Sequence, residues 1–364
     1  MFRRLLLLLA LAGLSACDIV DVQFADGTPA APAVSPATGG AASAGAAWYR
    51  LYFTDPPDKD DPANRPTNTV AEAVTASINT AARTVDAATY DFDLPAMAEA
   101  LIAAHDRGLV VRLVTDTDTL GEDVIKQIKK AGIQVVEDHR SAIMHDKFVI
   151  VDGLAVWTGS WNFSQNDNYR NNNNFIGIAS PEMVANYQVE FNEMFERREF
   201  GPSSTADTPY PQFTVGGTPI ENYFAPEDDV QSRIVAALQT ARASIYFAAF
   251  TFTSQPISQA IVDRAGAGVQ VEGVYEKRQV DAGSDESYNL LHQGGLPVLL
   301  DGNRYTMHHK FFVIDRQVVV TGSYNFTAAA NDSNDENVLI IHNADIAGQY
   351  YQEFLKVWQK AGGG

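Results

Sequence analysis

The amino-acid sequence predicts an α/β protein made of two similar α/β/α domains in a bilobal, pseudo-two-fold arrangement. Three observations lead to this fold class. Strand-like segments alternate with amphipathic helical segments, the same order of segments occurs twice, and matching residues of the two copies keep a constant offset over residues 144–163 and 307–326. Alternating strands and helices are typical of layered α/β folds, and a repeated unit indicates two domains of common architecture.

Each half is expected to start with a strand and a helix that ends at a glycine, because glycine adopts the left-handed conformation of a helix C-cap without strain. A second strand follows directly, and a further helix closes the half. The expected strand, helix and strand occupy residues 84–92, 94–107 and 109–115 in the first half and residues 244–252, 254–267 and 269–275 in the second, and the closing helices occupy residues 182–197 and 344–360.

The N-terminus has the pattern of a secretion signal. Arg3 and Arg4 precede an apolar run over residues 5–14, which is too short to span a bilayer comfortably. The following Leu-Ser-Ala-Cys resembles a bacterial lipoprotein box, so residues 1–17 are predicted to be a lipoprotein-type signal peptide with Cys17 as the lipidated N-terminus. Cys17 is the only cysteine in the chain and has no disulfide partner within it. The alternative is an ordinary signal peptide that happens to contain this cysteine.

Two segments lie outside the predicted domains, one before the first and one between the two. Residues 18–47 are rich in Ala, Pro and Gly and cannot bury enough apolar surface to offset their ordering entropy, so they are predicted to be a flexible tether. The alternative is a plain disordered leader without an anchor. Residues 201–219 are rich in Pro, Gly, Ser and Thr and are predicted to be a linker. The two domains are therefore expected at residues 48–200 and 220–361.

A His-x-Lys-x4-Asp motif occurs once in each half. Because side chains two residues apart in an extended chain point to the same face, each histidine is expected to project beside its lysine. Two ammonium groups can neutralise the non-bridging oxygens of a phosphodiester, while one imidazole attacks phosphorus and the other protonates the leaving oxygen. The motif residues are His145, Lys147 and Asp152 in the first half and His308, Lys310 and Asp315 in the second.

The aspartates of the motif are expected to play a different part. Asp152 lies an odd number of residues after Lys147, on the other face of the strand, and precedes a glycine as in a hairpin turn. We therefore expect Asp152 and Asp315 to support the site without entering the reaction.

Polar residues follow each motif in a shared Gly-Ser-x-Asn-Phe run. They are Ser160 and Asn162 in the first half and Ser323 and Asn325 in the second. We expect them to support the site or to bind the substrate phosphate, because hydrogen bonds from such groups strengthen as charge builds up in the transition state. The chain has no zinc-type spacing and no glycine-rich nucleotide loop, so neither a metal nor another cofactor is expected.

The doubled motif and the two Gly-Ser-x-Asn runs resemble the phospholipase D superfamily over about residues 48–361. The resemblance implies a bilobal fold with one active site at the interface of the halves, no metal cofactor and a covalent phosphohistidine intermediate. In two-copy members the first-copy histidine is usually the nucleophile. This implies that His145 is the nucleophile and that His308 is the general acid.

The chain departs from the family pattern at one position. The family usually has an acidic residue downstream of each motif that hydrogen-bonds the histidine of the opposite copy. Glu336 matches this position in the second half, but the equivalent residue of the first half is Asn173. If the pairing crosses between copies, Glu336 serves His145 and Asn173 serves His308. A carboxylate fixes the tautomer and stabilises imidazolium, whereas an amide does only the first.

Charge narrows the substrate class. The formal net charge is −19, whereas nucleic-acid binders usually present a basic face. We therefore expect a monomeric phosphodiester hydrolase of the phospholipase D type that acts on phospholipids. It is expected to be exported and lipid-anchored to a membrane of the bacterial cell envelope, in the periplasm or outside the cell.

The motifs leave three other functions open. The first is an exported, metal-independent nuclease acting on DNA or RNA, which the charge disfavours. The second is a lipid- or phosphate-binding module without catalysis, which the two complete motifs disfavour. The third is a transferase of phospholipid synthesis. Such enzymes usually have membrane-spanning N-terminal helices, and no apolar stretch of this sequence is expected to be long enough to form one.

Overall fold

The computed structural model describes residues 48–67 and 69–363. The predicted signal peptide, Cys17 and the tether of residues 18–47 lie outside the described residues. Within the described part, no helix is long and apolar enough to cross a membrane.

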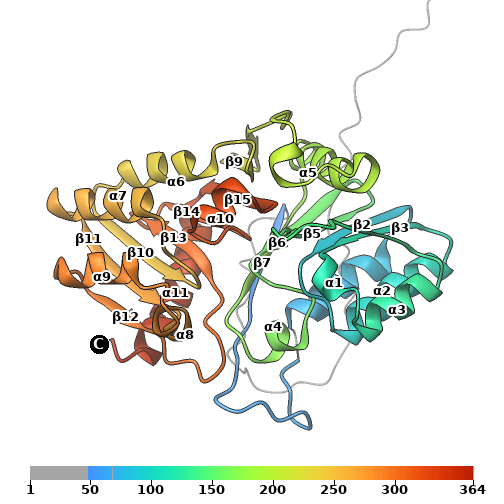
Figure 1. Cartoon of the computed structure of the whole chain (residues 1–364), viewed down its shortest axis with the longest axis horizontal. Coiled ribbons are helices and arrows are strands. Elements are labelled where there is room, and N and C mark those ends of the chain that lie inside the picture. Colours follow the sequence, from blue (N-terminus) through green and yellow to red (C-terminus); the bar gives the residue numbers. More distant parts are fainter. Residues whose placement is uncertain (1–47, 68, 364) are drawn as a thin grey trace, which may run out of the picture.

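Each half of the chain forms a mixed β-sheet flanked by helices (Figure 1). The first half contains β1 (Tyr49–Phe53), α1 (Val70–Thr80), β2 (Thr84–Thr89), α2 (Pro95–Asp106), β3 (Val110–Thr115), the short turn η1 (Thr117–Thr119), α3 (Asp123–Lys130), β4 (Gln134–Glu137), β5 (Lys147–Val151), β6 (Ala155–Gly159), α4 (Gln165–Tyr169), β7 (Asn174–Ile178), α5 (Pro181–Asn192) and the π-helical turn η2 (Glu193–Arg197). The second half follows the short turn η3 (Gly201–Ser203) and contains β8 (Gln212–Val215), β9 (Thr218–Ala225), α6 (Val230–Gln239), β10 (Ser244–Ala249), α7 (Gln255–Gly266), β11 (Gln270–Tyr275), α8 (Lys277–Asp281), α9 (Glu286–Gln293), β12 (Val298–Leu300), β13 (Lys310–Ile314), β14 (Val318–Gly322), α10 (Ala328–Asp332), β15 (Glu336–His342) and α11 (Ala344–Lys360).

The two sheets have the same strand order. The first runs β4-β3-β2-β5-β6-β7-β1, and the second runs β12-β11-β10-β13-β14-β15-β9, with β8 added at the edge beyond β9. In each sheet the first three strands are parallel and the remaining neighbours are antiparallel. This repetition confirms the predicted α/β class with two similar halves.

The crossover helices α2 and α7 begin and end as their local sequence predicts. α2 begins with Pro95, whose missing N–H is not needed in a first helical turn. α7 is capped by Ser254, whose side chain accepts a hydrogen bond from the N–H of Ile257 at 3.4 Å. Gly108 and Gly268 follow the two helices, each with a φ of 90°, a conformation that favours glycine. The predicted C-caps are confirmed.

Three hydrophobic cores hold the layers together. The outer face of the first sheet packs against α1, α2 and α3, which contribute Ile78, Leu101 and Ile128. Helices α6, α7 and α9 cover the second sheet in the same way. The inner faces of both sheets share a central core with α5 and α11, to which Tyr187 and Tyr350 belong. Helices therefore cover both faces of each sheet (Figure 1), with α5 against the first sheet and α11 against the second, and the central core joins the halves into one unit.

The segment expected as a linker is only partly irregular. It contains β8, and β9 begins within it at Thr218. The turn between these paired strands is made by Gly216 and Gly217, with φ values of 56° and 79°. A Gly-Gly pair between strand-like runs is a hairpin signal, but the composition of the segment is also typical of a linker. The second sheet therefore starts at Gln212, before the predicted boundary at residue 220.

Candidate active site

The first His-x-Lys segment pairs with the second half of the chain. β5 begins at Lys147, so His145 lies in the extended segment just before it. The N–H of His145 donates to the carbonyl oxygen of Asp335 at 3.0 Å. The next side chain, Glu336, thereby reaches the imidazole, and its Oε2 lies 2.8 Å from His145 Nδ1. The hydroxyl of Ser323 donates to the same carboxylate oxygen at 2.6 Å.

The second segment makes the equivalent contact with the first half. The N–H of His308 donates to the carbonyl oxygen of Asn172 at 3.0 Å. Asn173 Oδ1 lies 2.9 Å from His308 Nδ1 and accepts a hydrogen bond from the Ser160 hydroxyl at 2.8 Å. The structure therefore has the crossed pairing that the resemblance implies. Because Nδ1 of each histidine is held by an oxygen, Nε2 is the nitrogen left for chemistry.

A carboxylate that the sequence analysis missed also reaches the second histidine. Asp167, on α4, places Oδ2 at 3.4 Å from His308 Nδ1, and its side chain is only 3% exposed. The repeat offers no signal for this residue, because the equivalent position of the second half is Ala330 on α10.

The lysines complete a cationic site. Lys147 Nζ donates to the carbonyl oxygen of His145 at 2.6 Å, and Lys310 Nζ donates to that of His308 at 2.9 Å. Burial lowers the pKa of Lys147 to about 8, although Glu336 raises it. Burial and the charge of Lys147 lower the pKa of Lys310 well below its ordinary value. Both ammonium groups are therefore poorly solvated, and an anionic phosphate would stabilise their charge.

The histidines respond to the charges of both halves. Burial lowers the pKa of His145 well below its ordinary value, and Lys147, Lys310 and His308 lower it further. Burial and Lys310 lower the pKa of His308 to about 4, whereas Asp167 raises it. Lys147 of the opposite half also lowers the pKa of His308. Together with the crossed hydrogen bonds of the two imidazoles, these effects indicate that both His-Lys pairs lie at the junction of the halves.

The four polar residues after the motifs serve unequal purposes. The hydroxyls of Ser160 and Ser323 donate to the partners of the histidines, so these serines position the site. Asn162 Nδ2 donates to Asp167 Oδ2 at 2.8 Å. The Oδ1 atom of Asn325 is buried and has no hydrogen-bond partner among the described residues.

Asp152 and Asp315 lie at the far ends of β5 and β13. The carboxylate of Asp152 accepts hydrogen bonds from the N–H groups of residues 82–84 at distances between 2.6 and 3.1 Å. Asp315 binds the N–H groups of residues 242–244 in the same way. Both have positive φ in the turns that end their strands, which confirms the hairpin expected after Asp152. The structure therefore does not bring these aspartates to the histidines; they hold the starts of β2 and β10.

An aromatic ring flanks each His-Lys pair. The ring of Tyr90 lies 5.4 Å from that of His145 and 5.7 Å from Lys147 Nζ. The ring of Phe250 lies 4.6 Å from that of His308, and Lys310 Nζ lies 5.0 Å from its centroid. A cation near a ring face gains from the ring's quadrupole. The sequence analysis did not assign these rings to the site, although both follow equivalent strands, β2 and β10.

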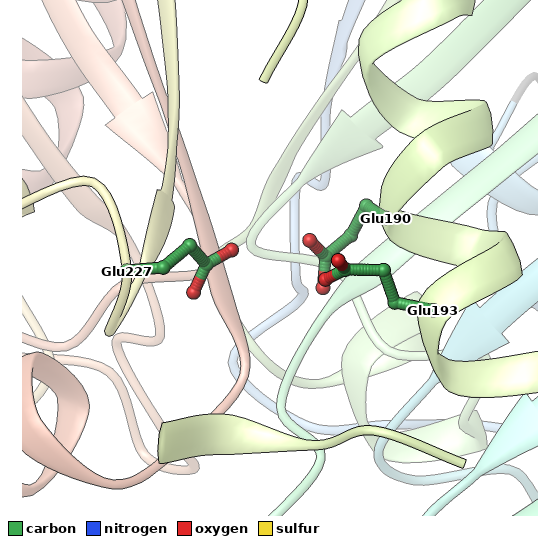
Figure 2. A group of neighbouring side chains, drawn as sticks. All are labelled: Glu190, Glu193 and Glu227. Carbon is green, nitrogen blue, oxygen red and sulfur yellow. The ribbon is translucent and has the colours of Figure 1, made fainter. Parts of the chain in front are cut away.

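Among the described residues, one acidic group is close enough to share a cation. Carboxylate oxygens of Glu190, Glu193 and Glu227 lie within 4.8 Å of one another. Figure 2 shows Glu190 and Glu193 projecting from one side toward Glu227 on the other. Burial raises the pKa of Glu227 to about 8 and that of Glu190 well above its ordinary value, with neighbouring carboxylates adding to both shifts. With this pKa, Glu227 holds a proton at neutral pH, and the group contains none of the motif histidines or lysines.

Comparison with known proteins identifies the family. The model of the family described as cardiolipin synthase, PLD-like domain, matches the chain twice, over residues 74–195 and 234–358. The chain belongs to the phospholipase D superfamily. A relative within the superfamily, phospholipase D of Rickettsia bellii, is 32% identical over 139 residues, which cover 37% of this chain and 67% of the relative.

A second relative matches a similar share of the chain, and a solved structure shares its fold. Mitochondrial cardiolipin hydrolase of Xenopus tropicalis is 35% identical over 133 residues, covering 36% of this chain and 63% of the relative. The chain spans between about half and two thirds of the length of the first curated relatives. Among solved structures, phosphatidylserine synthase of Haemophilus influenzae shares the fold, with a TM-score of 0.59, 12% identity, and coverage of 80% of this chain and 84% of that one.

Proposed function

We propose that the protein is a phospholipase D-type phosphodiester hydrolase that acts on phospholipids through a covalent phosphohistidine. The observation that carries the proposal is the crossed hydrogen bonding of His145 and His308, which turns two His-Lys pairs toward one site. Two relatives in the superfamily are named phospholipase D and cardiolipin hydrolase, which supports this reaction class. The net charge of −19 supports a lipid substrate over a long nucleic acid.

The proposed reaction has two balanced steps. In the first, the neutral Nε2 of His145 attacks phosphorus, and the bond to the leaving oxygen breaks while His308 donates its Nε2 proton to that oxygen. In the second, His308 takes a proton from water, the water oxygen attacks phosphorus, and the phosphorus–nitrogen bond breaks. Lys147 and Lys310 neutralise the non-bridging oxygens in both steps. Glu336 stabilises the positive charge that the phosphorylated imidazole of His145 carries.

The substrate test uses the full-length chain purified in detergent. Vesicles of phosphatidylcholine, vesicles of phosphatidylglycerol and single-stranded DNA are offered separately in the presence of EDTA. Release of the head group supports the proposal. Oligonucleotide products without head-group release would instead indicate a nuclease, and no turnover of any substrate would indicate a phosphate-binding module.

The intermediate has its own test. After a rapid alkaline quench with a nitrophenyl phosphodiester labelled at phosphorus, whose leaving group needs no proton, the protein is expected to carry label on His145, and the His308→Ala variant is expected to accumulate it because it cannot activate water. His145→Ala is the control and must carry no label. Label on His308 in the His145→Ala variant would reverse the proposed roles.

We also propose that the protein is exported and held at a membrane of the bacterial cell envelope by a lipid on Cys17. The basic start, the apolar run and the lipoprotein-like box support this localisation. Radioactive fatty acid is expected to label the wild-type chain and not Cys17→Ser, which should leave the membrane fraction. Equal labelling of both would contradict the anchor.

A further inference from the structure

The two histidines are held by different groups although their backbones are arranged alike. His145 has a carboxylate at hydrogen-bond distance from Nδ1, in Glu336, whereas His308 has the neutral amide of Asn173. An amide oxygen orients the ring but offers no net charge to an imidazolium. A general acid must carry its proton before it can donate it. The first half therefore needs another source of negative charge if His308 is the acid.

Asp167 is placed to be that source. Its Oδ2 lies 3.4 Å from His308 Nδ1, and the carboxylate and the ring are both almost fully buried. At this depth a charge is poorly screened by solvent, so its effect on the imidazole is large. The equivalent residue of the second half, Ala330, cannot carry charge, and there Glu336 supplies the carboxylate directly.

The surroundings of Asp167 keep it ionised. Its Oδ2 accepts hydrogen bonds from the backbone N–H and from Nδ2 of Asn162, both at 2.8 Å, and its Oδ1 accepts one from Asn171 Nδ2 at 2.6 Å. Burial alone would raise the pKa of Asp167, but the charge of His308 and these hydrogen bonds outweigh burial and hold it well below its ordinary value. A buried carboxylate with this many donors is a fixed charge, and its position is set by Asn162 and Asn171.

We propose that Asp167 is a positioning residue that holds the proton on His308 for transfer to the leaving group. This inference rests on the proposed function and assigns a task within the same site. The charge on Asp167 stabilises His308 as imidazolium before the first step and again after His308 has taken a proton from water. In the first half, Asn173 fixes the ring of His308 and Asp167 supplies the negative charge. In the second half, Glu336 does both for His145.

Substrates with different leaving groups give the kinetic test. An alkyl leaving group needs the proton of His308, whereas 4-nitrophenolate leaves without one. In Asp167→Asn, single-turnover cleavage of a dialkyl phosphodiester is expected to fall about 10- to 100-fold, because a carboxylate at this distance changes a pKa by about 1–3 units. The burst of 4-nitrophenol from a nitrophenyl phosphodiester is expected to change less than about threefold. Equal losses for both substrates would show a merely structural role and overturn the proposal.

Two further variants sharpen the kinetic test. Asp93→Asn removes another carboxylate near α4. The Oδ1 atom of Asp93 accepts the N–H of Gln165 at 2.6 Å, and within the described part of the chain Asp93 forms no hydrogen bond or ion pair with a histidine. It is expected to keep the leaving-group dependence of the wild type. Adding Asn173→Glu to Asp167→Asn places a carboxylate as in the second half and is expected to restore most of the alkyl-ester rate. A double variant no faster than Asp167→Asn would contradict the assigned role.

A titration separates failure of this inference from failure of the proposed function. The pKa values of the imidazoles are measured by nitrogen-15 NMR in the folded wild type and in Asp167→Asn. This measurement needs no substrate. The pKa of His308 is expected to fall by about one unit or more in the variant, while that of His145 changes much less. An unchanged pKa of His308 would overturn the inference even in an active enzyme. A lowered pKa of His308 in a protein that cleaves no phosphodiester would uphold the charge coupling between Asp167 and His308 and reject the proposed reaction.

Discussion

The two halves of the molecule share a strand order and a motif, yet they supply the site with different charges. The second half provides a carboxylate from β15 that touches His145 directly, whereas the first half provides an amide from the segment before β7 and a carboxylate from α4. Both arrangements place an oxygen on Nδ1 of a histidine of the opposite half. The comparison teaches that the repeated backbone determines where the rings lie, while individual side chains determine which ring carries charge.

This difference makes the two imidazoles chemically unequal. Burial lowers the pKa of both, but Asp167 partly offsets this effect at His308. The two rings also have different acidic neighbours, with Glu336 2.8 Å from Nδ1 of His145 and Asp167 3.4 Å from Nδ1 of His308.

The largest expected effect comes from removing the rings themselves. His145→Ala and His308→Ala are each expected to lower phospholipid turnover by about 10³-fold or more, because each removes a reacting group. They should differ on a nitrophenyl phosphodiester: His308→Ala is expected to keep a burst of one nitrophenol per enzyme, and His145→Ala is expected to lose it. Stopped-flow absorbance measures both. A burst retained only by His145→Ala would invert the comparison between the halves.

A smaller effect is expected from the residues that hold the rings. Glu336→Ala is expected to lower the steady-state rate about 100-fold, since it removes both the orientation and the charge at His145. Asn173→Ala is expected to cost about tenfold, because Asp167 still supplies charge to His308. Initial rates on one phospholipid, with thermal unfolding as the control for folding, give the comparison. Equal losses would mean that the two partners are interchangeable and that the halves do not differ as described.

Local sequence chemistry predicted the elements whose ends are set by local rules. The closing helix of the second half has the predicted bounds 344–360, and the glycines after α2 and α7 end these helices as expected. β8 was missed because the composition of its segment is that of a linker, and its hairpin depends on pairing with β9. Composition describes the average of a segment, whereas a strand is decided by its partner.

The site was predicted where it follows the repeat and missed where it departs from it. The crossed partners Glu336 and Asn173 could be placed by the repeat together with the family pattern. Asp167 could not, because its contact with His308 depends on how α4 packs and has no counterpart at Ala330. Asp152 was correctly expected to face away from Lys147, but the spacing alone did not show that it binds the start of β2.

The motif aspartates should behave alike in the two halves. Asp152→Asn and Asp315→Asn each replace a carboxylate that accepts backbone N–H groups, and these hydrogen bonds hold the carboxyl pKa low against the opposing effect of burial. Each variant is expected to lose about 1 kcal/mol of unfolding free energy at pH 7, measured by urea unfolding, and to keep the wild-type rate per folded molecule. The loss should shrink as the pH falls through the lowered pKa, because the wild-type carboxylate is then protonated too. A loss of activity in folded protein would place these aspartates back in the site.

The smallest effect is expected at the acidic group of Glu190, Glu193 and Glu227, which has members from both halves. Burial raises the pKa of Glu227 to about 8, above its ordinary value of 4.5, with neighbouring carboxylates adding to the shift. The folded state then keeps a proton that the unfolded chain has lost, so this contribution to stability is fully present below about pH 4.5 and is lost as the pH rises through 8. Glu227→Gln cannot titrate and is expected to reduce the fall in Tm between pH 5 and pH 8 by roughly 2–4 °C. Circular dichroism melts in EDTA measure this, and Glu99→Gln, an exposed change on α2, should leave the fall unchanged. An identical fall in Tm in wild type and Glu227→Gln would show that Glu227 is already ionised at neutral pH. The acidic group would then hold repelling charges from both halves.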